Sequence, residues 1–335
     1  MNAPILTFFN NKGGVGKTST LYNLSYMFSK LGKRVLAVDL DPQANLTSMC
    51  LDDDILWELW DEKSKVSNKQ TIYHAIQPLM EGVGDIQLIN PQSLINAIDY
   101  FLIPGDLRLS EFEDQLAREW NSVLGGKVLG INITSAFGRL IRQMATKYEI
   151  DIVFVDVGPN LGAINRAALI ASDYVVIPLV PDLFSLQGLK NVGKYLREWR
   201  QDWQQALEKI QKTASYPTGQ MQPVGYVMLQ HRERQARPIV AHQNWISRIP
   251  KTYSESILGK NGDAVVIPDP NQIGLVRNYQ SMMAMSHESR KPVFDLKSAD
   301  GAIGSHIRVV KESEDTYREL AKVIAERIGM LFDDE

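Results

Sequence analysis

Asn11-Lys12-Gly13-Gly14-Val15-Gly16-Lys17-Thr18 is the most informative stretch of this 335-residue sequence. It follows a short apolar run, Ile5–Asn10, that predicts a buried strand. It precedes residues 16–31, whose apolar side chains recur at helical spacing. Glycines in such a loop let successive backbone N–H groups converge on phosphate oxygens, and the helix N-terminus adds the positive end of its dipole. The stretch is therefore predicted to be a phosphate-binding loop.

Two side chains of this loop have the chemistry of nucleotide binding. Lys17 is expected to reach the β- and γ-phosphates, and the Thr18 hydroxyl is expected to ligate Mg²⁺. The common pattern G-x-x-x-x-G-K-S/T fails at its first position, which is Asn11 here, and a second lysine, Lys12, precedes a Gly-Gly pair. A glycine-rich turn that binds no nucleotide is the alternative, and the strand–helix context argues against it.

The second lysine gives the loop a resemblance to the deviant Walker A motif, K-G-G-x-G-K-S/T, of the ParA/MinD ATPase family. The resemblance implies that ATP and Mg²⁺ are the cofactors and that Lys12 reaches across a nucleotide-sandwich dimer to the partner's phosphates. Lys12 and Lys17 are then catalytic. The nucleotide-binding residues predicted in the loop are Asn11, Lys12, Gly13, Gly14, Val15, Gly16, Lys17, Thr18 and Ser19.

Two further acidic segments resemble the switches of that family. Asp39-Leu40-Asp41-Pro42-Gln43-Ala44-Asn45 is similar to the D-x-D-P-Q switch I segment, which implies that Asp41 orients or activates the attacking water. The apolar run 152–156 ends in Asp156, as a Walker B strand does, and Asp156 is expected to hold Mg²⁺. The predicted metal ligands are Thr18, Asp41 and Asp156. The family usually continues with x-P-P, whereas this chain has Gly158-Pro159-Asn160, so its switch II differs.

Short apolar runs alternate with helical patterns along the chain, which predicts a mostly parallel, twisted sheet flanked by helices, an α/β P-loop NTPase fold. One domain, 1–335, is expected, with a helical elaboration at about 50–130 and an exposed loop at 61–70. Strands are expected at 5–10, 35–40, 85–90, 151–157, 174–178, 224–230 and 264–267. Helices are expected at 16–31, 71–80, 106–120, 134–148, 162–171, 183–211 and 304–330.

The base-binding side of the site is predicted only by resemblance. The segment 265–270 occupies the place where the family's backbone contacts adenine, so Pro268 and Asp269 are candidates. Gln230, at the end of a predicted strand, stands where the family often has a residue that meets the base.

The charge distribution points to a second candidate surface. The whole chain carries a formal charge of −3, but residues 231–297 contain ten Lys or Arg against six Asp or Glu. The family binds DNA non-specifically through basic residues in its C-terminal part, which implies phosphate neutralisation here. A solvated surface of mixed charge is the alternative. The DNA-binding candidates are Arg232, Arg234, Arg237, Arg248, Lys251, Arg277, Arg290 and Lys291.

Composition excludes several other classes of protein. The single cysteine, Cys50, allows no intramolecular disulfide and argues against an iron–sulfur relative of the family, which needs paired cysteines. The five histidines show no metal-ligand spacing, so no metal other than Mg²⁺ is expected. No apolar stretch approaches 18 residues, and the start of the chain lacks the features of a secretory signal. A cytoplasmic protein is expected.

The resemblance implies a molecular switch. ATP is expected to close a homodimer that binds DNA non-specifically, and a ParB-like adaptor or another stimulating protein is expected to trigger hydrolysis, which is otherwise weak. The chain is most similar to short partition ATPases, with no helix-turn-helix before the first strand. A MinD-like membrane cycle is one alternative, but the closing acids Asp333-Asp334-Glu335 would be repelled by anionic lipid. A switch for another protein assembly, such as cargo positioning or defence, is the other.

Overall fold

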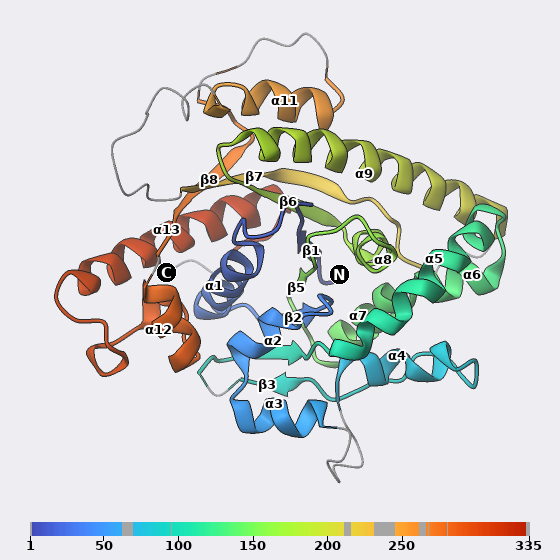
Figure 1. Ribbon diagram of the computed structural model, residues 1–335, viewed down its shortest axis with the longest axis horizontal. Helices are drawn as coiled ribbons and strands as arrows, with labels where there is room; N and C mark the ends of the chain where they lie inside the picture. Colours follow the sequence, from blue (N-terminus) through green and yellow to red (C-terminus); the bar gives the residue numbers. More distant parts are fainter. Residues whose placement is uncertain are drawn as a thin grey trace.

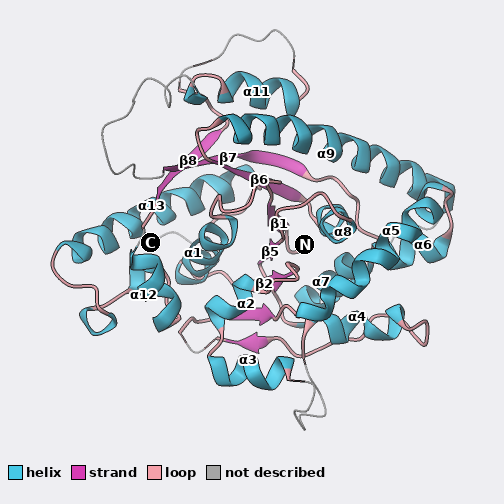
Figure 2. Ribbon diagram, in the orientation of Figure 1, coloured by secondary structure: helices cyan, strands magenta, loops and turns pink. Residues whose placement is uncertain are grey.

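A central sheet organises the computed structural model, which describes residues 2–61, 70–94, 96–210, 216–230, 245–260, 266, 268–279 and 281–332. In this part of the chain the sheet has eight strands in the order β3-β4-β2-β5-β1-β6-β7-β8. Only β3 and β4 pair in the antiparallel direction. Figures 1 and 2 show the twisted sheet between two layers of helices. The predicted α/β fold with a mostly parallel sheet is confirmed.

The strands are short and apolar because helices cover both faces of the sheet. They are β1 Ile5–Phe8, β2 Val35–Asp39, β3 Gln92–Ser93, β4 Tyr100–Ile103, β5 Ile152–Asp156, β6 Tyr174–Leu179, β7 Gln222–Gln230 and β8 Gln272–Arg277. Pairing of β2 with β5 sets Asp39 directly beside Asp156 at the carboxyl edge. Since β1 pairs with β5 on the other side, the phosphate loop that follows β1 meets both acids.

One helical layer packs around a core that includes Phe28 and Phe154 (left in Figure 1). Its helices are α1 Lys17–Lys30, α2 Asn45–Cys50, α3 Asp53–Trp60, α12 Ser281–Ser289 and α13 Ser305–Arg327, with the short 3-10 turns η2 Val293–Asp295 and η3 Ser298–Asp300. The rings of Phe28 and Phe332 lie 5.2 Å apart, so the end of the described chain packs against the helix of the phosphate loop.

The other layer covers the opposite face of the sheet, around Phe112 and Phe137. It contains α4 Ile72–Met80, the 3-10 turn η1 Leu107–Ser110, α5 Glu111–Leu124, α6 Val128–Thr134, α7 Ala136–Lys147, α8 Ala163–Ala171, α9 Leu183–Ile210 and α11 Ile249–Ser256. Within α9 the indole of Trp203 is fully buried and donates a hydrogen bond to the carbonyl of Pro217 at 2.8 Å. Phe184, at the start of α9, is 72% exposed.

The segment 50–130 is more than a helical elaboration, because it supplies strands β3 and β4 to the central sheet. The prediction of a strand at 85–90 is wrong. These residues form no strand, and of their apolar side chains only Ile89 is buried. The edge strand lies at 92–93 instead.

Some predicted features lie outside the described residues. They are the loop at 62–69, residues 211–215, three of the four residues of the predicted strand 264–267, and the acids 333–335. The last described strand is β8, which was not predicted. Among the described helices, none has both the length and the apolar character that crossing a bilayer requires.

Candidate nucleotide-binding site

The phosphate loop joins β1 to α1 and is held in a strained form that glycine permits. Gly14 and Gly16 have φ values of 70° and 75°, in the left-handed region. The side chain of Asn10 links the loop to β6. Its amide donates a hydrogen bond to the carbonyl of Pro178 at 2.7 Å, and its oxygen accepts one from the N–H of Lys12 at 3.0 Å. The loop thereby opens its amides toward the N-terminus of α1.

Lys17 is buried over this loop. Its ammonium donates a hydrogen bond to the carbonyl of Lys12 at 3.1 Å. Burial lowers the pKa of Lys17, and the charges of Asp156 and Asp41 oppose that shift. A buried ammonium beside backbone N–H donors is the arrangement that a bound polyphosphate requires.

Asp156 and Thr18 form the metal end of the site. The Thr18 hydroxyl donates to Oδ2 of Asp156 at 2.8 Å, while Oδ1 of Asp156 is buried and has no hydrogen-bond partner in the described part of the chain. Burial raises the pKa of Asp156, and the neighbouring Asp39 raises it further. A cation bound at this free oxygen would offset the free-energy cost of burying the charged carboxylate. Mg²⁺ commonly binds one or two carboxylates together with phosphate oxygens, so these residues fit the ion.

The two acids of switch I differ in their contacts. Asp39 is buried, and its carboxylate accepts hydrogen bonds from the N–H of Asp41 at 3.2 Å and from the N–H and hydroxyl of Thr47 at 2.8 and 2.7 Å. Asp41 accepts from the N–H of Gln43 at 3.0 Å and faces switch II, where a Cβ on Gly158 would lie 3.3 Å from Oδ1 of Asp41. Asp39 therefore shapes the turn, and Asp41 is free to act on a bound molecule.

Lys12 points away from its own phosphate loop. Its ammonium forms an ion pair with Asp182, which lies just before α9, and it lies 5.9 Å from the ring centre of Phe184. The side chains of Lys12 and Asp182 are 27% and 33% exposed, so this ion pair is half-buried and lies outside the fully buried site around Lys17. Asp182 was not predicted, because 170 residues separate it from Lys12 in the chain.

A cavity of about 150 Å³ adjoins the loop on its other side. Residues of the loop and the first turn of α1, from Gly14 to Thr20, form one wall, and the opposite wall comes from the ends of β7 and β8 and from α12. The residues of that second wall include Leu229, Val276, Asn278, Tyr279 and Met283. The cavity lies beside the phosphate loop and has both apolar and polar walls, as a base-binding pocket does.

Pro268 and Asp269, which were predicted to contact the base, do not line this cavity. Pro268 and Asp269 lie before β8, at the opposite end from the pocket, and the Asp269 carboxylate accepts a hydrogen bond from the hydroxyl of Tyr226 at 2.6 Å. The wall is formed by residues 276–279 instead, one strand length further on. The backbone of Gln230 pairs with that of Arg277 beside the pocket. The side chain of Gln230 is not among the described parts of the structure.

Comparison with known proteins agrees with this geometry. A family model described as an AAA domain matches residues 3–209. The sporulation initiation inhibitor Soj of Bacillus subtilis is 33% identical over 194 residues, 58% of this chain and 64% of that protein. A probable plasmid-partitioning protein ParA of Thermus thermophilus is 30% identical over 208 residues, 62% of this chain and 52% of that protein. The chain belongs to the ParA/MinD family of partition ATPases. Its match spans between about half and two thirds of the length of these curated relatives.

Several solved structures share the fold of this chain. A protein from Corynebacterium diphtheriae superposes with a TM-score of 0.70 at 22% identity, covering 97% of this chain and 98% of that one. An ATP complex of a McdA variant from Cyanothece gives a TM-score of 0.63 at 16% identity, covering 100% and 99%. The cell division ATPase MinD of Pyrococcus furiosus gives 0.56 at 16%, covering 97% and 99%.

The cationic residues that sequence suggested for DNA binding by this ParA/MinD-type chain separate into three groups. Arg248 and Lys251 are exposed at the start of α11, and Lys251 forms an ion pair with Glu255 of the same helix at 3.8 Å. Three more form ion pairs within the chain: Arg277 with Glu312 at 3.0 Å, Arg290 with Asp53 at 2.8 Å, and Lys291 with Asp300 at 2.7 Å. The remaining three, Arg232, Arg234 and Arg237, lie outside the described residues.

Proposed function

We propose that this chain is an ATP-dependent, dimerising switch ATPase that binds DNA non-specifically and acts in DNA partition or cargo positioning. The observation that carries the proposal is the pair of lysines in one loop. Lys17 is buried where it would contact the phosphates of its own nucleotide, whereas the half-buried Lys12 is held in an ion pair with Asp182. A loop lysine stored outside its own site is suited to complete the site of a second chain.

Nucleotide binding in this proposal uses the loop, the buried ammonium and the pocket together. The loop amides and Lys17 would hold the phosphates, and the cavity beside Leu229 and Tyr279 would take the base. Thr18 and Asp156 would hold Mg²⁺, which when bound supplies positive charge against the phosphate oxygens. Two solved neighbours have nucleotide complexes, the McdA variant with ATP and a diamide synthase from Mycobacterium smegmatis with ADP and magnesium.

Hydrolysis in this proposal depends on Asp41 and on the backbone of switch II. Asp41 would orient the attacking water and accept its proton, and the N–H of Gly158 would lie close to the γ-phosphate. Phosphoryl transfer of this kind needs positioning and charge more than covalent chemistry. A cation inserted at the right moment can contribute about 10³–10⁵ in rate. The proposal gives part of that effect to Lys12 of the second chain, so a single chain would hydrolyse ATP slowly and a partner could stimulate the dimer.

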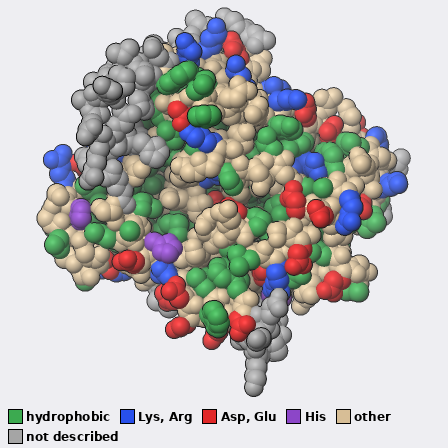
Figure 3. All heavy atoms as spheres, viewed as in Figure 1, with side chains coloured by type: hydrophobic (Ala, Val, Ile, Leu, Met, Phe, Trp, Pro, Cys, Tyr) green, Lys and Arg blue, Asp and Glu red, His purple; other side chains and the backbone are tan. Residues whose placement is uncertain are grey.

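The proposed DNA surface lies over α11 and the adjoining part of α9. Arg248 and Lys251 are exposed on α11, and Lys190 and Lys194 are exposed one turn apart on α9. Figure 3 shows Lys and Arg side chains gathered over these two helices, at the top of the view. α11 packs closely on α9, since a Cβ on Gly193 would lie within bonding distance of the Ser256 carbonyl. The proposed surface also carries acids, because Lys194 pairs with Glu198 at 3.9 Å and Lys251 with Glu255 at 3.8 Å.

A DNA titration tests this part of the proposal. We expect a DNA duplex to bind with Mg²⁺–ATP and to bind at least tenfold more weakly with ADP or without nucleotide, as measured by fluorescence anisotropy. Affinity should fall steeply with salt, because each neutralised phosphate releases counterions with a slope of about −0.9 per contact. The double variant Arg248→Glu/Lys251→Glu should weaken binding further.

The matched control for that titration is Lys322→Glu. This residue is exposed on α13, so it changes the charge away from α11. Binding that is independent of ATP, insensitive to salt, or equally weakened by the control would contradict the proposed surface.

A further inference from the structure

Glu113, on the first turn of α5, holds the start of another helix. Its Oε1 accepts a hydrogen bond from the N–H of Ala163 at 2.5 Å, and its Oε2 accepts from the N–H of Ile164 at 2.8 Å. These are the first two residues of α8, whose leading N–H groups have no partner within the helix. A carboxylate here makes charge-assisted hydrogen bonds and meets the positive end of the helix dipole.

The start of α8 determines where switch II lies. β5 ends at Asp156 and α8 begins at Ala163, so only residues 157–162 connect the metal-binding acid to the helix. Asn165 reaches back from α8, and its side-chain amide donates to the carbonyls of Gly158 at 2.9 Å and Asn160 at 2.7 Å. A shift of α8 would therefore carry Gly158 with it, away from Asp41.

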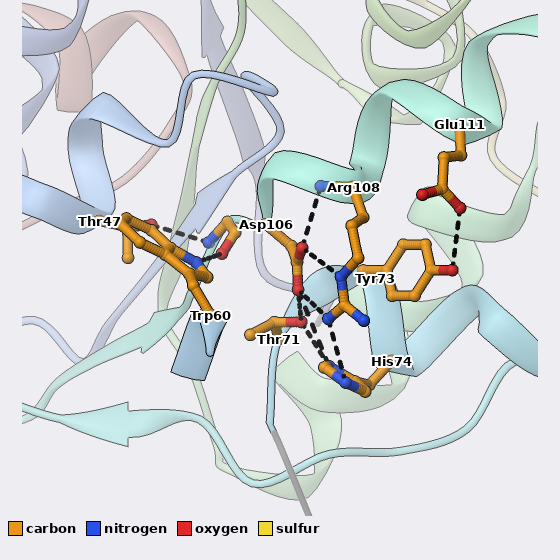
Figure 4. A network of polar contacts seen from close by, with 9 residues as sticks. Thr47, Trp60, Thr71, Tyr73, His74, Asp106, Arg108 and Glu111 are labelled. Carbon is orange, nitrogen blue, oxygen red and sulfur yellow. Dashed lines mark hydrogen bonds and ion pairs between the residues drawn. The ribbon is translucent and has the colours of Figure 1, made fainter. Parts of the chain in front are cut away.

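The segment that leads to Glu113 begins at Gly105, and Gly105 is attached to switch I. The N–H of Gly105 donates to the hydroxyl oxygen of Thr47 at 2.7 Å, and that hydroxyl donates to Asp39. The indole of Trp60 donates to the carbonyl of Gly105 at 3.1 Å. Figure 4 shows Thr47 and Trp60 converging on this point, beside Asp106. Residues 105–113, which we call the brace, thus run from switch I to the start of α8.

A buried polar network makes the brace rigid. Asp106 is almost completely buried, and its carboxylate accepts hydrogen bonds from the N–H and the guanidinium of Arg108 and from the hydroxyl of Thr71 at 2.7–3.0 Å. Further along, the hydroxyl of Tyr73 donates to Glu111 at 3.1 Å, and the Arg108 guanidinium lies 4.3 Å from the Tyr73 ring centre. Figure 4 shows these groups fastening the brace to α4. Satisfied networks of this kind hold one geometry.

We infer that Glu113 is a positioning residue for ATP hydrolysis: it fixes the start of α8, and so holds switch II against the γ-phosphate in register with switch I. The inference rests on the proposed ATPase function. Glu113 touches no nucleotide in this account, because it acts through the backbone of residues 157–164. Its loss should therefore slow turnover while leaving the binding of ADP, which lacks the γ-phosphate, unchanged.

The test compares Glu113→Gln with Asp114→Asn. Glutamine keeps the shape of the side chain but has no charge and places an NH2 donor where one carboxylate oxygen now accepts, so the arrangement of one N–H on each oxygen is lost. Asp114 is exposed on the same turn of α5, and its change removes the same charge without touching α8. We expect Glu113→Gln to lower kcat about 10- to 100-fold, the scale of a small misplacement of reacting groups. ADP affinity by calorimetry and the thermal midpoint should stay close to those of Asp114→Asn.

Two results would overturn the inference. One is a kcat for Glu113→Gln within twofold of the Asp114→Asn control. The other is a parallel loss of kcat, ADP affinity and thermal midpoint, which would mean that Glu113 only stabilises the fold.

A wild-type chain that binds ATP without hydrolysing it would contradict the proposed function instead. Hydrogen exchange over residues 157–165 then decides the role of Glu113. A non-hydrolysable ATP analogue should slow exchange there in the wild type and not in Glu113→Gln, and equal slowing in both would overturn the inference.

Discussion

Asp41→Ala is expected to lower ATP turnover by about 10²–10⁴-fold while ATP binding remains within a few fold of the wild type. Asp41 faces Gly158 of switch II, and in the proposed mechanism its carboxylate takes a proton from the attacking water. The loop amides and Lys17, which hold the phosphates, are unchanged in the variant. Phosphate release measured in single turnover, together with calorimetric ATP binding, checks both parts of this expectation.

Two further variants sharpen that result. Asp41→Asn keeps the shape and the hydrogen bond from Gln43, so it should be nearly as slow if the carboxylate acts as a base. Asp54→Asn changes an exposed acid on α3 and should turn over at the wild-type rate. Normal turnover by Asp41→Ala would remove this residue from the proposed chemistry.

Lys17→Ala is expected to weaken ATP binding about 100-fold, equivalent to about 2.7 kcal/mol. The Lys17 ammonium is buried above the loop and close enough to Asp156 and Asp41 for both to act on its pKa. Alanine removes the only described cation buried at this position, and bound phosphate would lose a charge-assisted partner there. Isothermal titration with ATP and with ADP measures the loss directly.

The control for Lys17→Ala is Lys12→Ala, a change of the same kind five residues away in the same loop. Because Lys12 points toward Asp182, its removal should leave the affinity of the single chain for ATP nearly unchanged. Equal ATP affinity of Lys17→Ala and the wild type would mean that residues 11–18 are not the phosphate-binding loop.

The sequence predicted those parts of the site that local pattern determines. A glycine-rich loop between an apolar run and a helical pattern placed Lys17 and Thr18 correctly relative to β1 and α1. An apolar strand that ends in an acid placed Asp156 beside them, since parallel strands bring their carboxyl ends to one edge. Each motif is recognisable within about ten residues, whereas the contact of Asp156 with Thr18, 138 residues away, follows from the resemblance to the family and its parallel sheet.

Short and weakly patterned elements were mispredicted for a physical reason. Residues 85–90 alternate apolar and polar side chains as a strand does, but Leu88 is exposed and the edge pairing forms at 92–93. β4 has four residues, too few to show a period, although it pairs with β2 as the second strand from one edge of the sheet. Pairing with a neighbour, rather than local pattern, decides such strands.

Long-range contacts of the site could not be predicted from one sequence. Asp182 meets Lys12 across 170 residues, and Glu113 meets α8 across 50. The cavity lining at 276–279 was not predicted, because strand β8 was not predicted, and base contact by Pro268 and Asp269 stays a prediction. Each of these contacts depends on the order of strands in the sheet, which motif spacing does not encode.

The central claim is that ATP joins two chains through Lys12, and sedimentation velocity tests it most directly. The wild type and Lys12→Ala are compared at equal concentration with ADP and with Mg²⁺ and a non-hydrolysable ATP analogue. We predict a monomer with ADP, a dimer with the ATP analogue, and a Lys12→Ala variant that binds the analogue yet stays monomeric. A wild type that remains monomeric with the analogue bound, or a Lys12→Ala variant that dimerises equally well, would contradict the account.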